Sequence, residues 1–183
     1  MKTSSLAKTF LASLFLLPAL SLGEGKQRVF NRDYSHTQQI FAEISTSEGV
    51  MKFELFYKFA PNTVANFIHL ADSVFYKGLT FHRVIQGFMV QGGDPKGDGT
   101  GGPGYTIPDE MRPELKVEVG TLAMANAGPN TTGSQFFICQ MPQSQLTGRY
   151  AIFGRLVSGF DVLTRVEKGD PIVDVKITEA KKS

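Results

Sequence analysis

Most apolar residues of this chain fall in short segments with a two-residue period, and turns that contain glycine separate these segments. A two-residue period places successive side chains on opposite faces of a β-strand. Residues 39–45 show this period, and residues 50–55 repeat it after a polar turn at 47–49. The two segments predict a β-hairpin, and the pattern as a whole favours a domain of many short strands.

Two segments have the helical period instead. Pro61 opens the first near its start, where the missing N–H of proline costs no hydrogen bond, and apolar residues recur through Asp72. Residues 159–168 form the second. Further strands are predicted at 79–85, 88–91, 120–125, 135–139, 151–156 and 172–178. This order predicts a closed barrel with a helix over each end, although the period alone supports only an antiparallel β-rich domain.

The first residues differ in kind from the rest. Lys2 and Lys8 precede an apolar run that is too short to span a bilayer, and small residues follow it. We therefore expect a secretory signal peptide at 1–23, with a buried core helix or an uncleaved membrane anchor as alternatives. Residues 24–38 are polar without a clear period, which predicts a flexible extension. A domain at 39–180 and a tail at 181–183 complete the predicted organisation.

The charge balance and the cysteine count exclude some classes of binding partner and of covalent cross-link. Lys2 and Lys8 are the only charged residues in the leader, so the remaining chain carries 17 basic and 17 acidic residues. This balance argues against nucleic acid as a partner, because nucleic-acid binding calls for a basic face. Cys139 is the only cysteine, which excludes a disulfide within the chain, and its apolar neighbours predict a buried side chain.

Four motifs give the sequence a resemblance to a known family. They are FHRVIQGFMVQGGD at 81–94, GTGGPGY at 99–105, MANAGPNTTGSQFFI at 124–138 and IFG at 152–154. With this order and spacing the chain resembles the cyclophilins over about residues 39–180. The resemblance implies a mainly β fold, a closed eight-stranded antiparallel β-barrel capped by two α-helices. It also implies peptidyl-prolyl cis-trans isomerase activity that needs no metal or other cofactor.

Arg83 is the residue that this chemistry needs most. Rotation about an X-Pro amide is slow because the C–N bond has partial double-bond character, with a barrier of about 18–20 kcal/mol. In the twisted amide the proline nitrogen loses conjugation and can accept a hydrogen bond. A permanently charged guanidinium beside that nitrogen would stabilise the twisted state more than either planar one. In a strand, Arg83 would share a face with Phe81 and Ile85; without the motif it would be interpreted as a surface arginine.

The resemblance also implies the rest of the substrate site. The positions of the apolar pocket for the substrate proline are Phe88, Met89, Phe137 and Leu146. The positions that hold the substrate backbone are Gln91, Ala125 and Asn126. Gln135 occupies a position that helps to orient the arginine. Considered singly, the apolar residues are more typical of a core and the glutamines of ordinary strands.

Two positions depart from many eukaryotic cyclophilins. Gln145 replaces a tryptophan that contributes to binding the drug cyclosporin, so we expect weak cyclosporin binding. Tyr150 replaces a histidine, and its ring can still form a wall of the proline pocket. These departures, together with the leader, resemble exported bacterial cyclophilins and favour the periplasm of a Gram-negative cell.

Other polar residues have simpler interpretations. His82 could be a general base, but no proton transfer is needed, so we expect a structural role. Asp94 and Asp98 lack the spacing of known calcium loops. We expect a monomeric isomerase that acts on proline-containing unfolded or partly folded polypeptides and has no stable membrane association after leader removal. The alternatives are an X-Pro-binding chaperone and an interaction module, each with little turnover.

Overall fold

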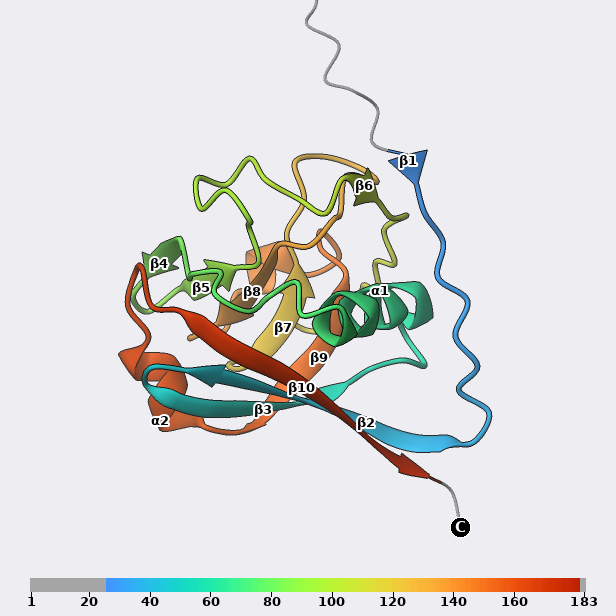
Figure 1. Cartoon of the computed structure of the whole chain (residues 1–183), viewed down its shortest axis with the longest axis horizontal. Helices are drawn as coiled ribbons and strands as arrows, with labels where there is room; N and C mark the ends of the chain where they lie inside the picture. Colours follow the sequence, from blue (N-terminus) through green and yellow to red (C-terminus); the bar gives the residue numbers. More distant parts are fainter. Residues whose placement is uncertain (1–25, 182–183) are drawn as a thin grey trace, which may run out of the picture.

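The computed structural model describes residues 26–181, in which one eight-stranded antiparallel sheet curls around an aromatic core (Figure 1). The elements in chain order are β1 (Lys26–Gln27), β2 (Thr37–Thr46), β3 (Gly49–Leu55), α1 (Pro61–Asp72), β4 (Arg83–Ile85), β5 (Met89–Gly92), β6 (Tyr105–Thr106), β7 (Thr121–Met124), β8 (Phe136–Cys139), the 3-10 helix η1 (Ser144–Leu146), β9 (Ile152–Ser158), α2 (Phe160–Arg165) and β10 (Ile172–Lys181). The sheet runs in the order β10-β2-β3-β9-β7-β8-β5-β4, and β1 pairs in parallel with β6 outside it. The predicted leader at 1–23 lies outside the described residues.

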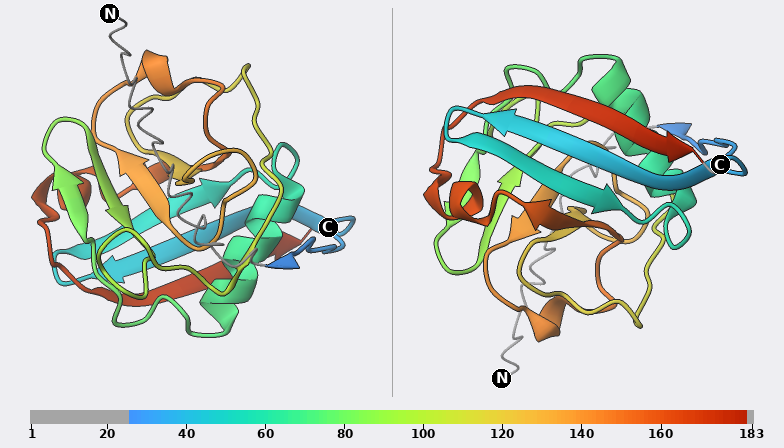
Figure 2. Two further views of the ribbon diagram at one scale, coloured as in Figure 1. Left: turned by 90° about the horizontal axis from the view of Figure 1, so that it is seen from above. Right: turned by 90° about the horizontal axis from the view of Figure 1, so that it is seen from below.

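The mainly β architecture with two helices is confirmed, but the sheet is a half-barrel rather than a closed barrel (Figure 2). Its end strands, β10 and β4, do not pair with each other. The edges approach only through the isolated bridge between Thr80 and Pro171 and a few backbone bonds, such as Phe81 N–H to Asp170 O at 2.9 Å. Pro171 has no N–H to donate, so the ladder cannot continue there.

The core lies between the concave face of the sheet and α1. Phe67 of α1 is fully buried, with its ring 5.8 Å from that of Phe136 and 5.1 Å from that of Phe153. Aromatic pairs of this kind contribute about 0.5–1.5 kcal/mol each beyond their buried area. Helix α1 therefore fixes β8 and β9 from inside, and β8 carries part of the site described below.

Helix α1 has the predicted bounds and an unusual N-terminal cap. Ala60 precedes it and has no side chain that could accept from the free N–H groups of the first turn. Glu110, distant in sequence, takes that role: its carboxylate accepts from the backbone N–H groups of Asn62 at 3.2 Å and Thr63 at 2.7 Å. The cap therefore ties the start of α1 to the long loop between β6 and β7.

Several boundaries differ from the sequence prediction. The strand predicted at 79–85 begins only at Arg83, and the helix predicted at 159–168 ends at Arg165. The polar extension at 24–38 was predicted to be flexible, but its described part packs against the domain. Lys26–Gln27 is a strand, and the rings of Tyr34 and Tyr57 meet at a tilt with their centroids 4.8 Å apart. Among the described residues, no helix is long and apolar enough to span a membrane.

Candidate functional site

Arg83 is the first residue of β4, an edge strand that pairs with β5. Val84 packs towards the main core, so the neighbouring side chains of Arg83 and Ile85 point outward and are exposed. The expectation that Phe81 shares this face is wrong, because Phe81 precedes the strand and is fully buried in the core. Arg83 is thus a cation fixed on a rigid strand and open to a ligand.

A chain of side-chain hydrogen bonds orients the guanidinium. Arg83 Nη1 donates to Gln91 Oε1 at 3.3 Å, and Gln91 Nε2 donates to Gln135 Oε1 at 2.9 Å. Gln135 Nε2 in turn donates to the backbone carbonyls of Gly99 at 3.0 Å and Gly101 at 2.9 Å. The guanidinium has five N–H donors, so the bond to Gln91 leaves others for a ligand.

The outward face of β4, β5 and β8, together with the residues that follow β7, forms a pocket of about 240 Å³ beside Arg83. The lining residues are Arg83, Phe88, Met89, Gln91, Ala125, Asn126, Phe137, Leu146 and Tyr150. These are all of the predicted site residues except Gln135, which lies behind Gln91. Gln145 lies on η1 next to Leu146, is exposed, and is not part of the lining.

A small apolar cluster supports this pocket from below. Met89 and Phe137 are buried within it, together with Cys139. The ring of Tyr150 meets Phe137 edge-on at 5.2 Å, which makes Tyr150 a side wall. Burial raises the pKa of the Cys139 thiol to about 12, so this thiol stays protonated at neutral pH and is a packing residue. The floor of the pocket is therefore apolar.

A second recess of about 680 Å³ adjoins the pocket, and the sequence reasoning missed it. Gln91, Ala125 and Asn126 line both cavities, so one extended ligand could occupy the two together. The remaining wall comes largely from the glycine loop at 99–104 and from Tyr105. Five of the lining residues are glycines, which have no side chain, so the clearest signal of this recess in the sequence is the glycines themselves.

Asp94 holds the glycine loop in shape. Its carboxylate is buried and accepts from the backbone N–H groups of Lys96 at 2.8 Å and Asp98 at 3.1 Å. Asp98 accepts from Thr100 N–H at 2.8 Å. Both acidic side chains therefore bind backbone of their own loop, which explains their position among glycines without a metal.

His82 lies behind Arg83 with a half-buried ring. Its two ring nitrogens are inaccessible to solvent and have no hydrogen-bond partner among the described residues. Burial lowers the pKa of His82, against an opposing effect of Asp94. A neutral ring without a partner cannot relay protons, which agrees with a structural role.

The chain is similar to known proteins both in sequence and in fold. The sequence model of the family described as "Cyclophilin type peptidyl-prolyl cis-trans isomerase/CLD" matches residues 41–182. A peptidyl-prolyl cis-trans isomerase of Synechococcus elongatus is 51% identical over 138 residues, which are 74% of this chain and 94% of that protein. A cyclophilin type isomerase of Cryptosporidium parvum has a similar structure, with a TM-score of 0.73 and 40% identity over 77% of this chain and 98% of that one. The structure of that protein in the presence of the dipeptide Ala-Pro matches with a TM-score of 0.67 and 41% identity, covering 79% of this chain and 100% of the other.

Proposed function

Since this chain belongs to the cyclophilin-type peptidyl-prolyl cis-trans isomerases, we propose that Arg83 and the apolar pocket beside it carry out its isomerase reaction. The observation that carries the proposal is the position of one oriented guanidinium at the rim of an apolar pocket of about 240 Å³. The pocket suits the pyrrolidine ring of a substrate proline. The structure of the related Cryptosporidium parvum protein in the presence of the dipeptide Ala-Pro supports this choice of ligand.

Catalysis in this proposal breaks no covalent bond. The pocket fixes the proline ring, and the acyl side of the amide rotates past it. As the amide twists, the lone pair of the proline nitrogen localises, and an N–H of Arg83 donates to it. The interaction is absent in both planar states, so it lowers the barrier without holding either isomer. Ala125 and Asn126 lie at the border of the two cavities, where they would hold the substrate backbone.

The test compares wild type, Arg83→Ala and Arg83→Lys on a short Ala-Pro peptide. Hydrogen bonds to charged groups contribute about 1.5–3 kcal/mol, so Arg83→Ala should lower kcat/KM roughly 10- to 100-fold. Arg83→Lys should recover part of the loss, because it restores a cation but not the planar fork. The control is Arg155→Ala, an exposed arginine on β9 outside the pocket. Equal rates for wild type and Arg83→Ala would remove Arg83 from this role.

A binding module would give a different result. In that case the wild type would bind the peptide with negligible isomerisation, and Arg83→Ala would change affinity only. Refolding of a client limited by proline isomerisation, measured at substoichiometric protein, separates turnover from holding. We expect acceleration at a few per cent of the client concentration.

We further propose that the clients are exported polypeptides and that the protein acts in the periplasm as a monomer. Support comes from the leader pattern at 1–23 and from the near-neutral remainder of the chain. The test is expression of the full chain in a Gram-negative cell, followed by fractionation and mass measurement of the product. Recovery of the protein in the cytoplasm at full length would contradict the proposal.

A further inference from the structure

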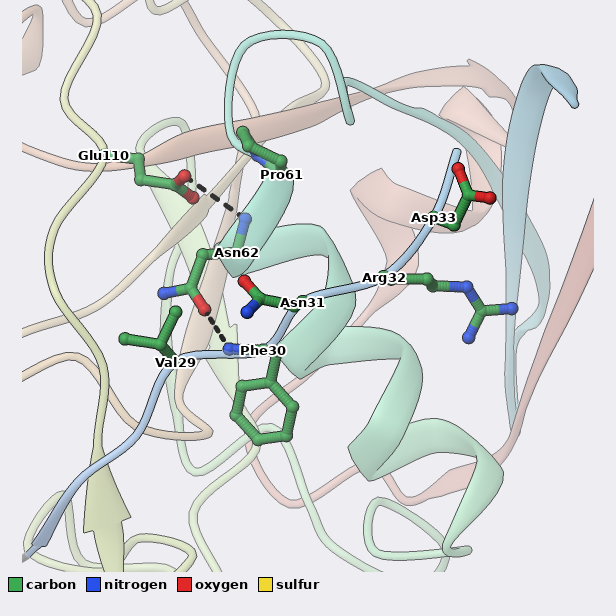
Figure 3. A pocket seen from close by; sticks show the side chains of 8 residues that line it. All are labelled: Val29, Phe30, Asn31, Arg32, Asp33, Pro61, Asn62 and Glu110. Atoms are coloured by element: carbon green, nitrogen blue, oxygen red, sulfur yellow. Dashed lines mark hydrogen bonds between the residues drawn. The ribbon is translucent and has the colours of Figure 1, made fainter. Parts of the chain in front are cut away.

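Residues 26–34 form a strap that runs along the outside of α1 from β6 to the start of β2 (Figures 1 and 3). Its distal end is held away from the site, where Arg32 pairs with Glu179 of β10. In the middle, Phe30 N–H donates to Asn62 Oδ1 on the first turn of α1 at 2.6 Å. Its proximal end reaches the wall of the second recess.

Tyr105 is the residue that this proximal end holds. β1 pairs with β6 in parallel, and Arg28 N–H donates to the carbonyl of Thr106 at 2.7 Å. The guanidinium of Arg28 lies 4.7 Å from the centroid of the Tyr105 ring, a cation–π geometry. The ring of Phe30 lies 5.7 Å from the same ring. The strap therefore contacts Tyr105 through backbone pairing of its strand and through two side chains.

Tyr105 links the strap to two loops that line the recess. It is half-buried, lines the recess and ends the glycine loop. Its hydroxyl donates to Asn66 Oδ1 at 2.7 Å, and Asn66 Nδ2 donates to the carbonyl of Gly133 at 2.9 Å. Gly133, in the loop at 126–134, also lines the recess. A shift of Tyr105 would thus move both the glycine loop and the loop at 126–134, which line the recess, while the proline pocket rests on β5 and β8.

We propose that Arg28 and Phe30 are positioning residues that act through Tyr105 to set the recess for the substrate chain flanking the proline. The inference rests on the proposed function, because it takes the neighbouring pocket as the proline site. Among the described residues, the strap makes no hydrogen bond, ion pair or ring contact with that pocket. Its effect is therefore on recognition of extended substrates and not on the isomerisation step.

The experiment uses two substrates with the full chain. One is a capped Ala-Pro dipeptide that fills only the proline pocket. The other carries several uncharged residues on both sides of Ala-Pro, so removal of a positive charge from the protein has no direct effect on it. For Arg28→Ala and Phe30→Ala we expect KM for the long substrate to rise roughly three- to tenfold, with kcat unchanged. For the dipeptide we expect kcat/KM to stay at the wild-type value.

Matched variants separate positioning from stability. Arg28→Lys keeps a cation over the Tyr105 ring and should restore most of the KM. Arg32→Ala removes the same charge from the distal end of the strap and should leave both substrates unaffected. Equal losses on both substrates, or no loss on either, would overturn the proposal. Arg83→Ala, in contrast, should lower kcat/KM for both substrates. This variant therefore tests the proposed catalytic role of Arg83 separately from the role of the strap.

Discussion

Asp109 and Asn130 bind each other in both directions, through one hydrogen bond each way. Asp109 N–H donates to Asn130 Oδ1 at 3.0 Å, and Asn130 N–H donates to Asp109 Oδ2 at 2.7 Å. The other oxygen of Asp109 accepts from the hydroxyl of Thr132, which is fully buried. Asp109 thereby fixes the loop at 126–134, which begins with Asn126 of the site.

We expect Asp109→Ala to release this loop. The variant loses two carboxylate hydrogen bonds and leaves the buried Thr132 hydroxyl without that acceptor, at a cost of about 1–3 kcal/mol in the free energy of unfolding. KM for an Ala-Pro peptide should rise, because Asn126 is no longer held. Asn130→Gly is the matched control. It keeps the left-handed backbone at this position, where φ is 57°, and loses only the bond from Asp109 N–H, so its effects should be smaller.

The glutamines behind Arg83 give a second prediction. Gln91→Leu keeps the approximate bulk of the side chain but removes the acceptor that orients the guanidinium. We expect a roughly tenfold lower kcat on a short Ala-Pro peptide, equivalent to about 1.4 kcal/mol of the barrier. Gln135→Leu should have a smaller effect, since Gln135 contacts Gln91 and not Arg83. Gln39→Leu, on the exposed face of β2, is the control, and a loss of kcat there would contradict the assignment.

The sequence predicted secondary structure best where the pattern of apolar side chains alone determines a helix or strand. The hairpin of β2 and β3 and the bounds of α1 follow from period and from Pro61, because a buried face imposes that period. The family motifs supplied Arg83 and the pocket, which the structure brings together although the lining comes from three strands, four loop positions and the η1 segment. Contacts made by backbone were not predictable in the same way.

The missed features are tertiary pairings of polar or glycine-rich chain. β1 and β6 have two residues each, too few for a period, and they form because the strap meets the end of the glycine loop. The shared bonds of Gln135 with Gly99 and Gly101 depend on the loop path, which glycine leaves open. The open edge between β4 and β10 was likewise missed, because the role of Pro171 in ending the pairing there depends on which segment lies opposite it in the folded chain.

His82 predicts a dependence of stability on acid. Burial lowers the pKa of His82 in the folded state below its ordinary value of about 6.5, so the unfolded chain binds the proton more strongly. The contribution of His82 to stability is therefore complete above about pH 6.5 and is lost as the pH falls below that value. Asp94 and Asp98 oppose this shift, while Arg83 and Lys168 reinforce it.

The measurement is denaturant unfolding of wild type and His82→Phe between pH 7 and pH 5. We expect the variant to lose less stability on acidification, because an apolar ring of similar shape takes no proton and leaves no buried nitrogen without a partner. His36→Gln changes an exposed histidine and should follow the wild type. If the free energy of unfolding of wild type and of His82→Phe fell equally between pH 7 and pH 5, His82 would not be the source of the acid dependence.

Alanine substitutions at Gly93 and Gly97, which lie close together in the chain, distinguish the cost of left-handed backbone strain from the cost of a steric clash. Both have positive φ, 82° and 71°, so alanine at either costs roughly 1–2 kcal/mol of left-handed strain. A Cβ at Gly93 would also lie 2.4 Å from the carbonyl oxygen of Ser134, whereas one at Gly97 meets no described atom within 4 Å. Gly93→Ala should therefore lower the free energy of unfolding well beyond Gly97→Ala. Equal losses for the two would show that the contact with Ser134 yields easily.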